Sequence, residues 1–318
     1  MSKPGKSPVL DPTGQYQRFD EIINTGTSIV QFKGYANRIG IEVTWHEIDI
    51  NHLNSNQVKY LLSYSETLKS LKCESLMSFL HCWVNEEKHV LCFITESLSS
   101  SSILEQVEHQ ATGPKALRKW FYAVLQALDY LHSRPTPIVH NHITLPSIFL
   151  KASTGHIKLI PPLVDPLVLK SAPNSLKLQN ITPPEALFQN LCPASDIWQF
   201  GIALLSAATQ TDPYSECKTP LELVHKLQNF QPPDCVNMVT DPTLASLIRS
   251  CLTPTSQRPN ARTLLSHPFF TNFNQKETKQ ETNIGLNNDI FQVIYSGTPN
   301  SSTTDLLAQE QTNKGSNL

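Results

Sequence analysis

The stretch that decides the fold covers residues 137–165 and reads PIVHNHITLPSIFLKASTGHIKLIPPLVD. It opens with an apolar run that leads into a polar turn at residues 140–142. A second apolar piece, Ile148–Leu150, passes through a Thr154-Gly155 turn into a third, Ile157–Ile160. Glycine accepts turn conformations at little steric cost, and apolar runs on both sides of a turn are typical of strands. We therefore expect two short strands and a polar loop.

The segment before this stretch predicts a long amphipathic helix. After Pro114, apolar residues recur at helical spacing over about four turns. They are Leu117, Trp120, Phe121, Val124, Leu125, Leu128 and Leu131. Downstream, further segments between proline-containing turns suit helices, at residues 196–210, 220–230, 242–251 and 261–265. This part of the chain is therefore expected to be mainly helical.

The N-terminal part of the chain is typical of a β-rich unit. Apolar or alternating runs predict five strands, at residues 19–23, 29–35, 41–50, 77–83 and 89–95. One helical pattern, residues 54–72, lies between the third and the fourth of these runs. Strands followed by helices indicate the α+β class.

Composition shifts divide the chain into four parts. These are a flexible N-terminal segment (1–14), a β-rich lobe (15–98), a helical lobe (99–273) and a disordered tail (274–318). The first segment holds three prolines, and the tail is rich in Asn, Gln, Thr and Ser with almost no periodicity.

Composition also excludes several classes of function. No apolar run approaches the roughly 20 residues that span a bilayer, and the N-terminus has no apolar signal core. The net charge is −2 with no block of Lys or Arg, so nucleic acid is not an expected partner. Seven cysteines form no C-x-x-C pair, which favours reduced thiols in a cytoplasmic protein.

Several motifs carry a resemblance to a known family. They include DPTGQYQRFDEI, GIEVTWHE, ALDYLHS, PIVHNHITLPSIFL, SDIWQFGIALL and RPNARTLLSHPFF, spread over residues 11–270. Their order resembles the With-No-Lysine (WNK) branch of the serine/threonine protein kinases. The chain also resembles the nuclear-receptor-binding-protein pseudokinases, which share the V-x-W-x-E strand. The resemblance implies a bilobal kinase-like fold, with a five-stranded antiparallel sheet and one helix in the N-lobe and a mainly helical C-lobe.

The resemblance places the phosphate-handling positions of a kinase on unusual residues. His46 stands where kinases carry a lysine, and a neutral imidazole is a poor replacement for an ammonium group. WNK kinases supply a lysine from the glycine-rich loop instead, but the matching position here is Ile29. The helix glutamate that holds this lysine is replaced by Tyr64. Lys33 lies at the end of its strand, and we expect its side chain to point elsewhere.

The catalytic-loop positions also differ. The general base is replaced by His142, the following lysine by Thr144, and the metal-binding asparagine by Ser147. The metal loop begins at Pro161, which has no carboxylate to hold Mg²⁺. Asp165 could be proposed as a displaced metal ligand, but the gap-free spacing of this stretch argues against it.

Other positions fit the family. Those matched to residues that support the fold are His140, Glu185, Asp196 and Arg258. A weak or absent nucleotide pocket is expected near Gly26, Thr44, Thr95, Glu96, Leu98 and Phe149. Gln31 and Thr44 stand where apolar side chains usually enclose adenine, and we expect no cofactor and no bound metal.

Three functions follow from this pattern. We expect a pseudokinase, not an enzyme, that acts as a scaffold or allosteric regulator of signalling proteins, other kinases among them. The first alternative is a weakly active WNK-like Ser/Thr kinase that binds ATP and uses His142 as its base. The second is a metal-dependent enzyme that uses the histidines at 132, 140, 142 and 156, although zinc sites usually need three or four protein ligands.

Overall fold

A computed structural model describes residues 9–25, 29–97, 101–109, 112–151, 154–162 and 181–270. The chain divides into two compact units, residues 1–274 and 275–318. The second unit lies wholly outside the described residues, and with it the tail that we expected to be disordered.

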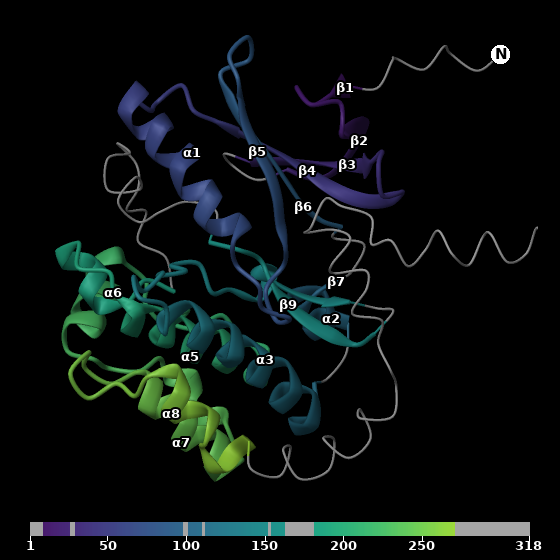
Figure 1. Cartoon of the computed structure of the whole chain (residues 1–318). Coiled ribbons are helices and arrows are strands. Elements are labelled where there is room, and N and C mark those ends of the chain that lie inside the picture. Colours follow the sequence, from purple (N-terminus) through teal and green to yellow (C-terminus); the bar gives the residue numbers. More distant parts are fainter. Residues whose placement is uncertain are drawn as a thin grey trace, which may run out of the picture. The chain divides into compact units, whose positions relative to one another are not determined.

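The N-terminal lobe is built on an antiparallel sheet (Figure 1). Its strands, in spatial order, are β1 (Val9–Leu10), β2 (Tyr16–Thr25), β3 (Ile29–Ala36), β4 (Ile41–Asp49), β6 (Val90–Glu96) and β5 (Phe79–Asn85). All five predicted strands are present. The expected count of five is corrected to six, because the two-residue β1 pairs with β2 at Arg18 and Gln17.

Residues 9–14 form a short strand and a turn, within the segment 1–14 whose expected flexibility stays a prediction. The Asp11 side chain is buried, and its carboxylate accepts hydrogen bonds from the backbone N–H of Thr13 at 3.0 Å and of Tyr16 at 2.7 Å. Gly14 adopts φ +68° in the turn that follows. An aspartate side chain that bonds its own turn in this way stabilises the turn. Residues 1–8 lie outside the described part.

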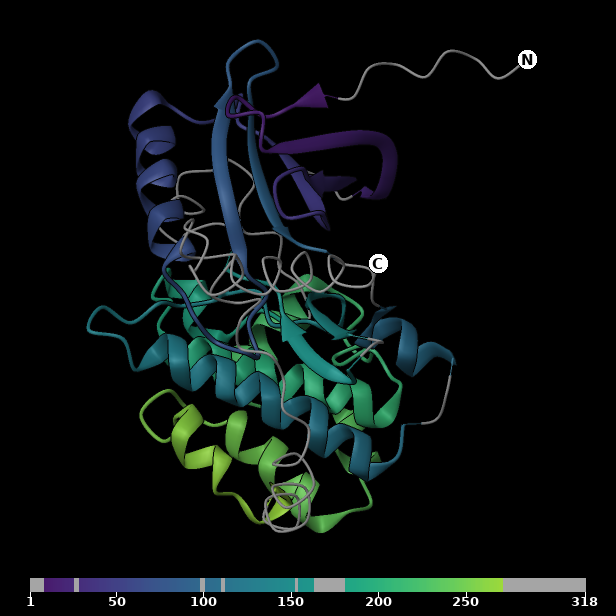
Figure 2. The same ribbon diagram turned by 45° about the vertical axis from the view of Figure 1, so that its right-hand side comes forward.

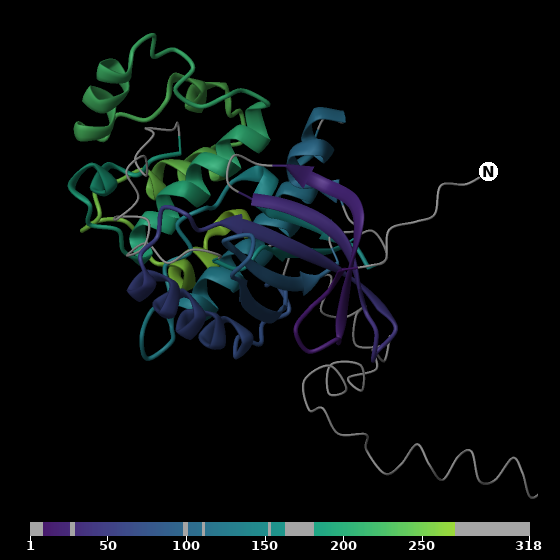
Figure 3. The ribbon, with the colours of Figure 1, turned by 90° about the horizontal axis from the view of Figure 1, so that it is seen from above.

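Helix α1 (Ser55–Lys69) lies beside β5 (Figure 2). It begins where the Asn54 side chain accepts from the backbone N–H groups of Asn56 and Gln57, and it buries Leu61 and Leu68. It ends before the predicted residue 72, because the Ser70 hydroxyl donates to the Thr67 carbonyl at 2.6 Å. Seen from above, α1 runs along one side of the curled strands (Figure 3).

The C-terminal lobe is mainly helical, as predicted. Its α-helices are α2 (Ile103–His109), α3 (Pro114–His132), α5 (Pro193–Thr209), α6 (Pro220–Gln228), α7 (Pro242–Cys251) and α8 (Ala261–Leu265). Short 3₁₀ helices are η1 (Leu145–Ser147), η2 (Pro184–Phe188) and η3 (Asp234–Met238). The predicted apolar stripe of α3 is buried, with only Trp120 partly exposed. Phe121 of α3 meets Phe200 of α5 edge to face, which places the core between these helices.

A small sheet stands between the helical layer and the N-terminal lobe. It contains β7 (Ser101–Ser102), β8 (Ile148–Lys151) and β9 (His156–Leu159) in that order. Strands β8 and β9 are the two short strands predicted from the opening stretch, and Gly155 turns between them at φ +67°. The polar loop before β8 therefore lies next to the N-terminal lobe.

Candidate active site

The loop at residues 140–143 is held by hydrogen bonds to Asp196 on α5. This side chain is fully buried. One carboxylate oxygen accepts the backbone N–H of Asn141 at 2.7 Å, and the other accepts that of His140 at 2.8 Å. The second oxygen also lies 2.8 Å from Nε2 of His132 at the end of α3. A buried carboxylate is stable here because all its partners are donors.

Gln199 is a second anchor of the loop, and sequence reasoning missed it. Its Oε1 accepts the backbone N–H of Ile143 at 3.0 Å, and its Nε2 donates to the Asn141 carbonyl at 3.3 Å. Gln199 lies three residues after Asp196 on α5, and residues with this spacing share one helix face. A polar residue one turn after a buried aspartate, on a helix that is otherwise apolar, was the available signal.

His140 connects this loop to the segment after β9. Its Nε2 lies 2.7 Å from the Ile160 carbonyl, and its Nδ1 accepts the backbone N–H of His142 at 3.2 Å. The proton therefore sits on Nε2, and burial lowers the pKa of this imidazole to about 4. His140 thus acts as a neutral bridge between two loops, and not as a charged group.

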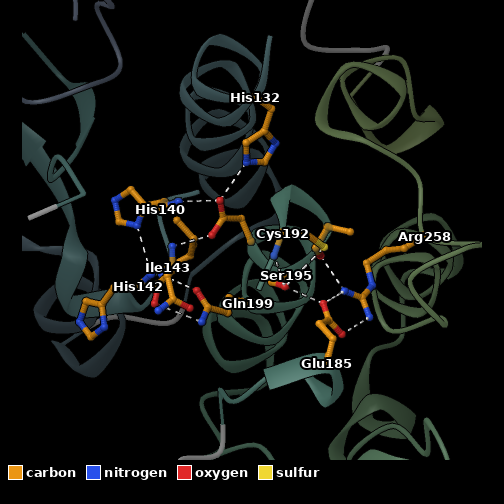
Figure 4. A network of polar contacts seen from close by, with 12 residues as sticks. His132, His140, His142, Ile143, Glu185, Cys192, Ser195, Gln199 and Arg258 are labelled. Atoms are coloured by element: carbon orange, nitrogen blue, oxygen red, sulfur yellow. Dashed lines mark hydrogen bonds and ion pairs between the residues drawn. The ribbon is translucent and has the colours of Figure 1, made fainter. Parts of the chain in front are cut away.

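Glu185 and Arg258 form a buried ion pair behind the same helix (Figure 4). Arg258 Nη1 lies 2.6 Å from Glu185 Oε1, and Nη2 lies 3.3 Å from Oε2. The guanidinium also donates to the carbonyls of Ala194 and Thr253, and the Ser195 hydroxyl donates to Glu185 at 2.8 Å. Such complete pairing offsets the cost of removing both charges from water.

Of the remaining loop positions, His142 is exposed and Ser147 is buried. The His142 side chain is exposed, yet the protein around it removes part of its hydration and lowers the pKa of its imidazole. Ser147 is buried, and its hydroxyl donates to the Thr144 carbonyl at 2.8 Å and accepts the Thr144 N–H at 2.9 Å. The Ser147 hydroxyl is therefore used up by the backbone of Thr144 in a local turn, while the His142 side chain is open to solvent.

The positions after β9 do not fit a magnesium ion. Pro161 is buried and has no carboxylate, and the neighbouring Ile160 N–H donates to the Ser147 carbonyl at 3.0 Å. Asp165 lies outside the described residues. Among the residues that are described, no three His, Cys, Asp or Glu side chains gather as metal ligands. Nε2 of His132 lies 2.8 Å from Asp196, and Nδ1 of His156 lies 3.0 Å from Glu74.

His46 lies in the interior of the N-terminal lobe. It is 2% exposed, and its ring stacks on Phe93 with centroids 4.3 Å apart. Its Nε2 lies 2.8 Å from the Thr95 hydroxyl, which itself donates to the Glu96 carbonyl at 3.1 Å, so Nε2 carries the proton. Burial lowers the pKa of His46 to about 3, so it is neutral at pH 7.

The predicted pocket positions are only partly brought together. Thr44 and Thr95 are paired neighbours on β4 and β6, and both are fully buried. Phe149 is half-buried on β8, whereas Gly26 and Leu98 lie outside the described residues. Tyr64 on α1 stacks on Tyr60.

Two further positions concern a replacement for the missing lysine. The Lys33 Nζ lies 3.2 Å from Glu42 on β4, both side chains being exposed. Ile29 is partly buried against the main core. Neither residue places a cation beside His46.

A family model described as "Protein kinase domain" matches residues 18–270. The chain belongs to the protein kinase family. Among curated proteins it is 29% identical over 272 residues to "Serine/threonine-protein kinase WNK8" of Arabidopsis thaliana. It is 28% identical over 275 residues to "Probable serine/threonine-protein kinase WNK5" of Oryza sativa subsp. japonica, and 30% over 267 residues to "Probable serine/threonine-protein kinase WNK6" of the same plant.

The matches cover most of this chain and a varying share of the relatives. They include 84%, 85% and 81% of the chain, in the order given, but 48%, 84% and 60% of the three kinases. The chain thus spans about half the length of WNK8. The predicted kinase-like fold and the WNK-like resemblance are both confirmed.

The expectation that this kinase-family chain is not an enzyme is contradicted. Each of these relatives is named as a serine/threonine-protein kinase, and the kinase domain model matches across the site. None of the described helices combines the length and apolar composition that a membrane crossing requires.

Proposed function

We propose that this chain is a slow, atypical WNK-like Ser/Thr protein kinase that binds ATP and phosphorylates proteins. The observation that carries the proposal is the exposed His142 imidazole, which stands at the general-base position. Its loop is held by Asp196 and Gln199 through backbone hydrogen bonds of 2.7–3.0 Å. The kinase names of the relatives support the same reaction.

The chemistry asks one thing of His142. As the substrate hydroxyl oxygen forms a bond to the γ-phosphorus, the bond from that phosphorus to the β–γ bridging oxygen breaks and ADP leaves. The hydroxyl proton passes to the neutral imidazole. Because the pKa of His142 is lowered, the imidazole is free to accept this proton at pH 7. A positioned general base contributes roughly 10²–10⁴-fold to such a rate.

The turnover is expected to be low. The positions that normally hold a cation, a metal-binding asparagine and a metal-binding carboxylate are taken, in that order, by His46, Ser147 and Pro161. A single cation on the transferring phosphate can be worth about 10³–10⁵ in rate. We therefore expect turnover orders of magnitude below the roughly 1–100 s⁻¹ of complete kinases. No step is assigned to a magnesium ion, because the described residues do not fit one.

A radiolabelled phosphate-transfer assay tests the proposal. The full chain is incubated with γ-labelled ATP and a Ser/Thr peptide mixture, beside the variant His142→Ala. His52→Ala is the matched control, because His52 is an exposed histidine in a turn of the other lobe. We expect incorporation in the wild type and the control, and a loss of at least about a hundredfold in His142→Ala. Equal incorporation in all three proteins would overturn the proposal.

A second function, regulation by binding, is supported by a separate observation. The Ser147 hydroxyl bonds the Thr144 backbone and His46 Nε2 bonds the Thr95 hydroxyl, at 2.8–2.9 Å, so the polar groups at these positions serve the fold of the domain. We propose that it also acts as a scaffold or allosteric regulator of cytoplasmic signalling proteins, other kinases among them. Measuring the activity of a co-purified kinase with wild-type and His142→Ala chains tests this, since such regulation is expected to be unaffected by the substitution.

A further inference from the structure

A lysine is buried where the two lobes meet. Lys158 lies on β9, and its side chain is 8% exposed. Its Nζ lies 3.2 Å from Oε1 of Glu96 and donates to the Leu76 carbonyl at 3.2 Å. A buried ammonium group is costly unless it is paired, so both partners are needed to keep it there.

Glu96 is the last residue of β6, where the chain leaves the N-terminal lobe, and we call Glu96 and Ser97 the hinge. Its carboxylate oxygen Oε1 also accepts the backbone N–H of Ser78 at 2.7 Å. Its own backbone N–H donates to the Ser78 carbonyl at 3.0 Å, and its carbonyl accepts from the Thr95 hydroxyl. The side chain and the backbone of Glu96 are therefore all fixed.

Backbone pairing completes the connection on the side of β9. Leu159 donates to the Ser75 carbonyl at 2.9 Å and accepts the Met77 N–H at 2.8 Å. These two bonds flank the Lys158 contact to Leu76. The segment 75–78 thus lies between a strand of the lower lobe and the hinge glutamate, and Lys158 contacts both. We call Lys158, Glu96, Leu76 and Ser78 the hinge clamp.

We infer that Lys158 is a positioning residue that, through Glu96, fixes the hinge and so sets the spacing of the two lobes. The inference stands on geometry: one buried cation joins a strand of the lower lobe to the hinge carboxylate and to the segment before β5. Its consequence for nucleotide binding rests on the proposed function. A hinge already fixed in place loses less conformational freedom when a ligand binds its backbone.

Hydrogen exchange on the full chain tests the clamp itself. The variant Lys158→Met removes the cation, and Lys69→Met is the matched control, since Lys69 on α1 is 26% exposed and pairs at 2.7 Å with the exposed Glu66. We expect the amides of Ser78 and Glu96 to exchange at least tenfold faster in Lys158→Met than in Lys69→Met. Lys158→Arg, which keeps the charge, is expected to restore protection. Equal exchange in the Lys158→Met and Lys69→Met variants overturns the inference.

A charge-reversed pair covers the case in which Lys158→Met does not fold. In Glu96→Lys with Lys158→Glu the ion pair is restored in the opposite sense, so we expect folded protein with more protection at Ser78 than in Glu96→Lys alone. No gain over the single variant counts against the clamp.

Titration with a fluorescent ATP analogue tests the consequence separately. A tenfold weaker Kd in Lys158→Met, restored by Lys158→Arg, supports a positioning role. An unchanged Kd confines the clamp to the fold, and absent binding in the wild type contradicts the proposed function alone.

Discussion

The candidate site has two halves, the residues around α5 and the residues at the phosphate-handling positions, and they differ in whether buried charges are kept. Around α5, buried charges are kept and fully paired, as in Asp196 with its three donors and Glu185 with Arg258. At the phosphate-handling positions the charges are gone, and His46 and Ser147 bond to neighbours within the protein. In this chain, therefore, the geometry of the loop at residues 140–143 is maintained by the α5 residues and not by the residues at the phosphate-handling positions.

The comparison also explains why a slow reaction is the function we propose. Asp196 and Gln199 on α5 hold the loop, and the His142 side chain on this loop is exposed. Electrostatic stabilisation of the transferring phosphate is usually the larger contribution to catalysis, and it is what the His46 and Pro161 positions no longer supply. Positioning and proton transfer are what remains.

The largest expected effect comes from breaking the ion pair behind α5. Arg258→Met leaves the Glu185 carboxylate buried without its partner, so we expect a loss of about 3–5 kcal/mol in the free energy of unfolding. At roughly 2–4 °C per kcal/mol, the melting temperature falls by roughly 10 °C. The control is Arg262→Met, because Arg262 pairs with Asp129 but is 73% exposed, and its loss costs at most about 1 kcal/mol. Equal shifts in calorimetry would show that burial does not distinguish the two pairs.

The pH dependence of stability tests the buried imidazoles. The pKa values of His46 and His140 are lowered to about 3 and about 4, so the unfolded chain binds protons below pH 6.5 that the folded chain does not. Stability is therefore full above pH 6.5 and is lost as the pH falls towards 4. Each histidine contributes about 1.4 kcal/mol per pH unit within this window.

Urea unfolding at pH 7.5 and pH 5.5 measures this loss, expected to be about 3 kcal/mol for the two histidines together. In His46→Gln one of the two titrating groups is removed, so about half of the loss should disappear. A pH dependence identical to that of the wild type would contradict the assignment of His46 as a buried neutral imidazole.

A smaller effect is expected from the second anchor. Gln199→Leu keeps the side-chain volume but leaves the Ile143 N–H without its acceptor, at a cost of about 1–3 kcal/mol. The exposed Gln228 at the end of α6 provides the matched control, Gln228→Leu. Denaturant midpoints distinguish the two, and equal midpoints would mean that Asp196 alone holds the loop.

The smallest effect on stability is expected at Ser147, which stands where the family carries a metal-binding asparagine. Ser147→Ala removes the hydroxyl that closes the turn with Thr144, at a cost of about 1 kcal/mol. Ser266→Ala, at the exposed end of α8, is the control and should shift the melting temperature by less. A loss of stability several times larger than expected would mean that Ser147 also anchors the loop, and would contradict the distinction between the two halves of the site.

Much of the fold could be predicted from the sequence, because the spacing of apolar residues distinguishes helices from strands where the pattern is long. The α3 stripe and the β8–β9 pair are examples. The turn at Asp11 was missed, since prolines outweighed one side-chain hydrogen-bond pattern. Gln199 was missed although its spacing from Asp196 was a signal, because its partner Ile143 lies more than 50 positions away. The Lys158–Glu96 pair could not be predicted, because these residues are also more than 50 positions apart and meet only in three dimensions.

The pH profile of phosphate transfer tests the central claim most directly. Single-turnover rates from γ-labelled ATP to a Ser/Thr peptide are measured between pH 5 and pH 8 in the wild type and in His142→Ala. The account predicts a rate that falls as the pH drops below the ordinary imidazole range, because protonation removes the base, and no such profile in His142→Ala. Transfer that is independent of pH, or a profile shared by both proteins, would contradict it, as would the absence of transfer at every pH.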